Sequence, residues 1–174
     1  MKLRNELLKE HSKAHSQSLA TFIGNDTMLF AELIEVFLCD EYRVTQRASH
    51  VLSECADRHP QLIAPYLKKL LLNLQNPVHN AVKRNTFRVL QDFDLPDDEE
   101  ILSLAAEVGF ATLQSNKEAV ATKAFAMTVL GNVCKKVPEL TQELKIIIED
   151  QMPYGSPGFV ARGKKVLKTL QNIT

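Results

Sequence analysis

Basic side chains recur at helical spacing in four predicted helices, and they are the residues of this chain best suited to binding an anion. Arg43, Arg47 and His50 are separated by four and three residues, so on a helix they share one face. Turning the apolar stripe of each helix inward leaves the basic residues in solvent. A row of such side chains suits a phosphate backbone or an acidic peptide. The candidate binding residues are Arg43, Arg47, His50, Arg84, Arg88, Lys123, Arg162 and Lys165.

The same basic residues have a second interpretation, in which they pair with acidic residues of neighbouring turns. Asp40, Glu41, Glu54 and Asp57 are close enough in the sequence to serve as such partners. The cations would then form a structural ladder of salt bridges and would not be available to a ligand. The sequence leaves both interpretations open.

Metal-ligating and catalytic residues form no recognisable pattern. His11 and His15 lie four apart on a predicted helix, as metal-binding histidines can, but no carboxylate lies between them and no third ligand can be named. Three scattered cysteines, Cys39, Cys55 and Cys134, indicate small buried hydrophobic side chains and not disulfides or metal ligands. No nucleophile elbow or glycine-rich phosphate loop is present. We therefore expect no metal, no cofactor and no enzymatic activity.

The composition is that of an ordinary soluble protein. The chain has 174 residues, of which 45% are hydrophobic, and its 21 Lys and Arg residues balance 21 Asp and Glu residues. This balance gives no general attraction to nucleic acid or to acidic membranes. No apolar run approaches the roughly 18 residues of a membrane span, and the first residues lack a secretory apolar stretch. We expect a cytoplasmic protein.

The elements that position the basic residues repeat along the chain. Four apolar doublets at the ends of predicted helices follow one another at steps of 38, 40 and 37 residues. A period near 40 in a helical chain is typical of a solenoid of helical hairpins. The doublets are Val51-Leu52, Val89-Leu90, Val129-Leu130 and Val166-Leu167.

Turn signals divide the chain into helices. Gly24-Asn25-Asp26, His59-Pro60 and Leu95-Pro96 end one helix and start the next. We predict an all-α fold, a right-handed α-α superhelix of about four helical hairpins plus an N-terminal helix, in one domain. The domain covers 1–174, with the N-terminal helix in 1–25 and helical pairs in 26–59, 60–95, 96–137 and 138–174.

Several helix limits and faces follow from the same signals. One N-terminal helix is predicted over about 2–23, with Leu3, Leu7, Ala14, Leu19 and Phe22 near its buried face. Met28 is placed in the apolar stripe of the next helix. Later helices are predicted to start at Asn76-Pro77 and at Ser115-Asn116. The segment starting at Pro60 matches the segment starting at Pro138 at an offset of 78, which is two repeat periods.

The charges separate between the two helices of each pair. The first helices (26–40, 61–75, 97–114, 138–152) hold 13 acidic and 3 basic residues, a net charge of −10. The second helices (42–59, 77–93, 116–137, 157–171) hold 14 basic and 4 acidic residues, a net charge of +10. Stacked hairpins place all second helices on one surface, usually the concave one. The sequence therefore predicts a basic groove and an acidic back.

The chain resembles the HEAT-like (armadillo-type) helical repeat superfamily from about Asp26 to the C-terminus. The resemblance rests on second-helix segments such as Tyr42–Ala48 and Phe159–Leu167. It implies the stacked-hairpin shape strongly and says little about activity. The whole chain also looks like a group of short bacterial HEAT-like proteins through segments such as 41–48, 76–86 and 148–156.

Some members of that group carry the name adenylosuccinate lyase, but the residues do not support that activity. The lyase family is much longer, and its serine-rich signature loop is missing; only Met152-Pro153-Tyr154 is similar to it.

Three functions are therefore weighed. The first is a non-enzymatic scaffold for protein–protein interaction that binds a protein or acidic peptide through the basic groove. The alternative is nucleic-acid binding, as in alkylation-repair HEAT-like proteins, which the groove charge favours and the scarcity of aromatic residues opposes. Lyase activity is third and disfavoured.

Overall fold

The computed structural model describes residues 3–39 and 41–173, and these residues form helices and no β-strand. The predicted all-α class is confirmed. The chain divides into two compact units, one ending at Val89 and the other beginning at Leu90. Each unit is described by itself. The prediction of one domain over 1–174 stays a prediction.

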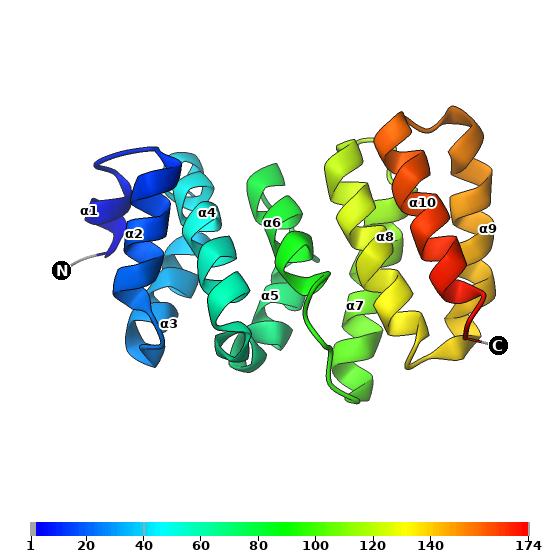
Figure 1. Ribbon diagram of the computed structural model, residues 1–174, viewed down its shortest axis with the longest axis horizontal. Helices are drawn as coiled ribbons and strands as arrows, with labels where there is room; N and C mark the ends of the chain where they lie inside the picture. Colours follow the sequence, from blue (N-terminus) through cyan, green and yellow to red (C-terminus); the bar gives the residue numbers. More distant parts are fainter. Residues whose placement is uncertain (1–2, 40, 174) are drawn as a thin grey trace. The chain divides into compact units, whose positions relative to one another are not determined.

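The first unit consists of stacked helical pairs. In Figure 1, α2 and α4 lie side by side, and the contacts between elements place α1 next to α3 and α2 next to α4. The elements are α1 (Leu3–Leu7), α2 (Lys13–Ile23), α3 (Thr27–Phe37), α4 (Tyr42–Arg58), the 3₁₀ turns η1 (Pro60–Leu62) and η2 (Ala64–Tyr66), α5 (Leu67–Asn73) and α6 (Asn80–Leu90).

The predicted single helix over 2–23 is wrong. Two helices, α1 and α2, take its place, and Lys2 lies outside the described residues. The break occurs because Ser12 starts a new helix: its Oγ accepts a hydrogen bond from the His15 N–H at 3.1 Å. The N-terminal segment therefore contains two helices, of which α1 contacts α3 and α2 contacts α4.

The break also changes which side chains are buried. Leu3, Leu7 and Leu19 are buried as predicted, whereas Ala14 and Phe22 are exposed. In α2 the new helical phase turns Ser16 and Ala20 inward with Leu19. Phe22, at 54% exposure, points away from that face.

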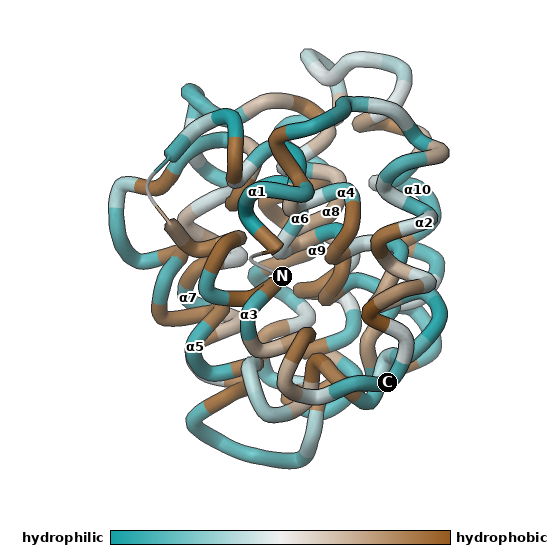
Figure 2. The backbone as a smooth tube through the Cα atoms, turned by 90° about the vertical axis from the view of Figure 1, so that its left-hand side faces the viewer, coloured by the Kyte–Doolittle hydropathy of each residue, from teal (hydrophilic) through white to brown (hydrophobic). Residues whose placement is uncertain are grey.

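The core of the first unit includes buried side chains of α3, α4 and α5. Phe30, Phe37 and Leu52 are completely buried, and the ring of Phe30 lies 5.8 Å from the ring of Tyr66. Met28, predicted to belong to the same stripe, is 78% exposed because it is in the first turn of α3, where Asp26 accepts hydrogen bonds from the N–H groups of Met28 and Leu29. In Figure 2 the colour along the helices alternates between hydrophilic and hydrophobic, as expected for amphipathic helices.

Proline sets the entrance to the third helical pair. Pro60 begins η1, and α5 starts only at Leu67, after Pro65 in η2. Pro138, the residue two periods later, also begins a 3₁₀ turn, η3 (Pro138–Leu140). The predicted correspondence of these two segments thus extends to their backbone conformation.

The start of α6 lies later than predicted. The helix begins at Asn80 and not at Asn76-Pro77. The imidazole of His79 accepts a hydrogen bond at Nδ1 from the Ala81 N–H at 3.0 Å, which is the role of a capping side chain. His79 therefore precedes the helix, whereas the predicted start at Asn76-Pro77 would place it in the first turn.

The second unit holds two further helical pairs, with α8 packed against both α7 and α10 (Figure 1). Ser156 caps α10 ahead of Pro157. The helix predicted from Ser115-Asn116 begins only at Val120. The elements are α7 (Glu99–Gln114), α8 (Val120–Cys134), η3, α9 (Thr141–Gln151), η4 (Met152–Tyr154) and α10 (Pro157–Leu170).

Each apolar doublet lies in the second helix of a helical pair. The doublets are in α4, α6, α8 and α10, and all their members are buried except Leu167, which is half-buried. Leu130 and Val166 belong to one core cluster of the second unit together with Ile148. The period near 40 is thus a period of core residues.

Candidate functional site

The first unit contains a basic cavity of about 460 Å³. Its walls come from the segment that starts α2, from the middle of α4 and from α6. We call it the basic cavity. Its lining residues are His11, Ser12, Lys13, Ser16, His50, Ser53, Glu54, Arg84, Asn85 and Arg88.

The break between α1 and α2 builds one wall of the basic cavity. Ser12 caps α2, and the Oγ of Ser16 donates to the Ser12 carbonyl at 3.1 Å, which fixes the first turn. His11 precedes this turn, and its ring centroid lies 5.7 Å from that of His50 on α4. The break in the helix therefore places His11 beside His50, which is one of the predicted binding residues.

The arginines of the basic cavity differ in whether they have an ion-pair or hydrogen-bond partner within the protein. Arg84 is exposed and makes no hydrogen bond or ion pair with any residue that the structure describes. Arg88 is half-buried and its Nη2 lies 3.4 Å from Oδ2 of Asp57. Glu54 is 3.4 Å from Arg58 in the next turn. The arginine best placed to meet a ligand is Arg84.

The charges around His50 favour its neutral form. Its pKa is lowered from 6.5 first by burial and then by the positive charges of His11, Arg84 and Arg88. A neutral imidazole can donate or accept a hydrogen bond, and it becomes a cation when an anion offsets its neighbours.

Two of the predicted residues on α4 lie outside the lining of the cavity. Arg47 is half-buried and donates from Nη1 to the carbonyl oxygen of Leu7 at 3.0 Å. This bond ties the end of α1 to α4. Arg43, in the first turn of α4, is exposed and has no hydrogen bond or ion pair within the described part of the chain.

The predicted residues of the second unit are mostly engaged within it. Arg162 donates from Nη1 to Oε1 of Gln91 at 2.8 Å and to Oγ1 of Thr128 at 2.6 Å. Its guanidinium carbon lies 5.9 Å from the centroid of the Phe125 ring. Lys165 is exposed. Arg162 therefore has a structural role, because its donors are directed at internal acceptors.

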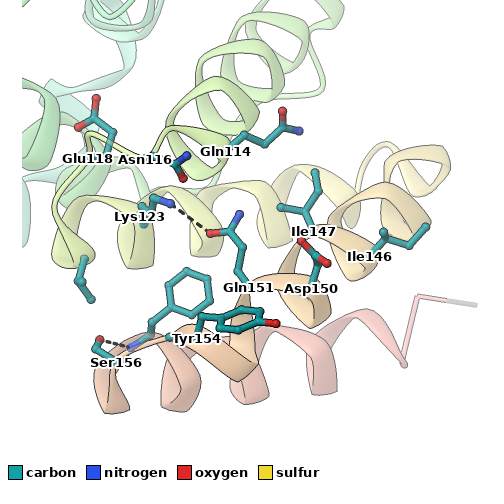
Figure 3. A pocket seen from close by; sticks show the side chains of 13 residues that line it. Gln114, Asn116, Glu118, Lys123, Ile146, Ile147, Asp150, Gln151, Tyr154 and Ser156 are labelled. Atoms are coloured by element: carbon teal, nitrogen blue, oxygen red, sulfur yellow. Dashed lines mark hydrogen bonds between the residues drawn. The ribbon is translucent and has the colours of Figure 1, made fainter.

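Lys123 lies in a separate cavity of the second unit, of about 630 Å³. Figure 3 shows its Nζ reaching the side chain of Gln151, at 3.1 Å, with Tyr154, Ile146 and Ile147 on the α9 side. Tyr154 is 92% and Ile146 55% exposed. The pKa of Lys123 is lowered, because the effect of burial exceeds the opposite effect of the negative charge of Glu118. This mixed apolar and polar surface was not predicted.

The predicted acidic partners of the basic residues are found in part. Asp57 pairs with Arg88, but Glu54 pairs with Arg58, and Glu41 pairs with Arg4 of the N-terminal segment. Asp40 lies outside the described residues. The structural ladder thus includes Arg88 and leaves Arg84 available, while one groove shared by all eight candidate residues stays a prediction.

Sequence reasoning missed Lys13 and Ser53 of the basic cavity. Lys13 is the first residue of α2, so its position depends on the break after Leu7. Ser53 lines the cavity from α4, together with His50 and Glu54. Ser12, a good N-cap residue, was a sequence signal for a helix start at this point. The alternation of leucines and charged residues before it favoured one continuous helix instead.

The described residues contain no group of three or more His, Cys, Asp or Glu side chains suited to a metal ion. His15 is engaged at Nε2 with the Glu6 carbonyl oxygen at 2.9 Å. Burial raises the pKa of Cys55 to about 12 and that of Cys134 to about 11. None of the helices described has the length and apolar character of a membrane span.

Helical pairs stacked side by side within each unit define a helical repeat protein. The family model of the HEAT repeat domain matches residues 3–170, and the chain therefore belongs to the HEAT repeat family. Repeats of this family are scaffolds that usually serve protein interactions. Comparison with curated proteins and with solved structures gave no match.

Proposed function

We propose that this protein is a non-enzymatic interaction scaffold that binds an acidic segment of a protein partner at the basic cavity of its first unit. The observation that carries the proposal is the cluster of Arg84, Lys13 and His50 around one cavity, with Arg84 lacking any partner among the described residues. An arginine without an internal acceptor keeps all its donors for a carboxylate.

The rigid repeat scaffold supports this function. Each wall of the basic cavity comes from a different helix: α2 packs against α4, and the Arg88–Asp57 ion pair joins α6 to α4. A preformed site loses little conformational entropy when a ligand binds. Nucleic acid is the weaker candidate because no Phe, Tyr or Trp is among the residues that line the cavity.

The proposal is tested with a fluorescein-labelled oligoglutamate peptide by fluorescence anisotropy at low and physiological salt. We expect binding to the wild type and a loss of at least about tenfold in affinity in the double variant Lys13→Glu/Arg84→Glu, because two cation–carboxylate contacts become repulsive. Both residues are exposed, so the variant keeps its fold, which circular dichroism checks.

The matched control is Lys164→Glu, which reverses an exposed lysine of α10 in the other unit. Equal loss of affinity in the control and in the double variant would show a general charge effect and would contradict the proposal. Labelled duplex DNA is measured beside the peptide. Tighter binding of the duplex, lost in the same double variant, would favour nucleic-acid binding instead.

A further inference from the structure

The basic cavity offers more donors than a carboxylate needs. Ser53 lines it from α4, is 7% exposed, and its buried Oγ has no hydrogen-bond partner among the described residues. A buried hydroxyl without a partner destabilises the folded protein, and a ligand bound in the basic cavity can supply that partner.

The first turn of α2 adds further donors. Ser12 accepts the His15 N–H at Oγ, which leaves its own hydroxyl proton free to donate. The 11-residue helix α2 also turns its N-terminal end, with Ser12, Lys13 and Ser16, to the basic cavity. The unpaired N–H groups and the partial positive charge at a helix N-terminus favour an anion.

The charge of the lining matches a dianion. Among the described lining residues Lys13, Arg84 and Arg88 are cations and Glu54 is the single carboxylate, which leaves a net charge of +2 before the histidines are counted. A phosphomonoester carries about −1.5 to −2 charges at neutral pH, whereas a carboxylate and each phosphodiester carry one. Protonation of His50 can add a further positive charge when the anion binds.

We propose that the basic cavity binds the phosphate group of a phosphorylated serine or threonine in the partner segment, with Arg84, Lys13, Ser53 and the first turn of α2 as donors. This inference rests on the proposed function, because it names the chemical group within the acidic segment. The alternative of a nucleic-acid phosphate is disfavoured by the single charge of a phosphodiester and by the absence of stacking rings among the lining residues.

His50 makes the binding sensitive to pH. The charged and titratable groups that face it across the basic cavity are His11 and Lys13 from the α2 side, Arg84 and Arg88 from α6, and Glu54 from its own helix. The cations disfavour protonation of His50 in the free protein, and a bound dianion reverses that effect. Binding is therefore coupled to proton uptake.

The test uses isothermal titration calorimetry with three forms of one peptide, in which a central residue flanked by glutamates is serine, phosphoserine or glutamate. We expect phosphoserine to bind at least about tenfold more tightly than glutamate, since it adds charge-assisted hydrogen bonds. Inorganic phosphate is expected to compete. Titration in buffers of different ionisation enthalpy is expected to show proton uptake for the phosphorylated form.

Two variants separate binding from folding. Ser53→Ala removes a hydroxyl that has no partner in the free protein, so we expect thermal stability that is unchanged or higher and a weaker preference for phosphoserine. Arg84→Ala is expected to lose most of the preference, and Lys164→Ala in the other unit none of it. Ser53→Ala with an unchanged preference would remove Ser53 from the site and overturn the arrangement proposed.

The failures of the two proposals are distinguishable. If the glutamate peptide binds at Arg84 and phosphoserine gives no gain, the acidic-segment function stands and the phosphate inference is wrong. If neither peptide binds, both are wrong. A single-stranded oligonucleotide that competes more strongly than the phosphopeptide would replace the partner class proposed here.

Discussion

At the scale of single residues, the basic side chains fall into two groups according to the acceptors beside them. Arg47 and Arg162 reach carbonyl, amide or hydroxyl oxygens of their own unit and stabilise the helical packing. Arg84 and His50 face the basic cavity instead. The same residue type on equivalent helices thus serves either folding or binding, and only the local acceptors decide which.

Arg162→Ala is predicted to destabilise the protein. The change removes hydrogen bonds to Gln91 and Thr128 and the contact of the guanidinium with Phe125. We expect a loss of about 1–3 kcal/mol in the free energy of unfolding, measured by urea denaturation. Lys165→Ala, which changes an exposed neighbour, is expected to stay within about 0.5 kcal/mol. Equal stability of the two variants would contradict the structural role of Arg162.

The cysteines are predicted to differ in reactivity. Burial raises the pKa of Cys55 to about 12 and of Cys134 to about 11, so both stay protonated at neutral pH, while Cys39 is only half-buried. Titration with a thiol-reactive chromophore should modify Cys39 first and the other two only after denaturation. Fast modification of Cys55 in the native protein, located by peptide mass spectrometry, would show that α4 is less closely packed than described.

His50 is predicted to lower stability in acid. The pKa of His50 in the folded protein lies below its usual 6.5, so the unfolded chain binds a proton more readily and stability is lost as the pH falls below about 6.5. We expect the melting temperature of His50→Gln to fall less than that of the wild type between about pH 7 and pH 5. Parallel curves for the two proteins would show that His50 does not contribute.

At the scale of helices, the sequence was sufficient where core residues and turn residues agreed. The apolar doublets are almost all buried, and the matched residues Pro60 and Pro138 both begin 3₁₀ turns. The fold class and its repeats could be predicted because each signal depends on residues close in the chain. These local signals also placed His50, Arg84 and Arg88 on the second helices of their pairs.

The rest depended on contacts between distant residues. Leu3 and Leu7 fit one long helix with Leu19 by periodicity, but they lie in a separate α1 that packs beside α3. The acceptors of Arg162 are 34 and 71 residues away in the chain, so its internal role had no sequence signal. The basic cavity needs three helices together, and therefore Lys13 and Ser53 were not found from the sequence.

Gly109 is predicted to be required for the packing of α7 against α8. A Cβ at this position would lie 2.8 Å from Cδ2 and 2.9 Å from Cγ of Leu130, which is completely buried. We expect Gly109→Ala to cost about 1–3 kcal/mol in the free energy of unfolding. Gly158→Ala is the matched control, because a Cβ there meets nothing within 4 Å and alanine favours the helix. A Gly109→Ala variant as stable as the control would contradict this close approach.

At the scale of the whole molecule, a balanced total charge conceals a strong internal separation. The 21 basic and 21 acidic residues cancel, yet the second helices of the pairs carry a net +10 and the first helices −10. A neutral protein exerts little long-range attraction on polyanions, so recognition must come from local sites. The basic cavity is such a site, because its cations lie within one unit and converge on one volume.

The most direct test of this account is nuclear magnetic resonance titration of the isotope-labelled protein with the acidic peptide. We expect backbone shift changes to concentrate at the start of α2, around His50 and Ser53 in α4, and around Arg84 in α6. We also expect Lys13→Glu/Arg84→Glu to abolish these changes. Changes centred on the surface around Tyr154 and Lys123 in the other unit, with the basic cavity unaffected, would contradict the proposed site.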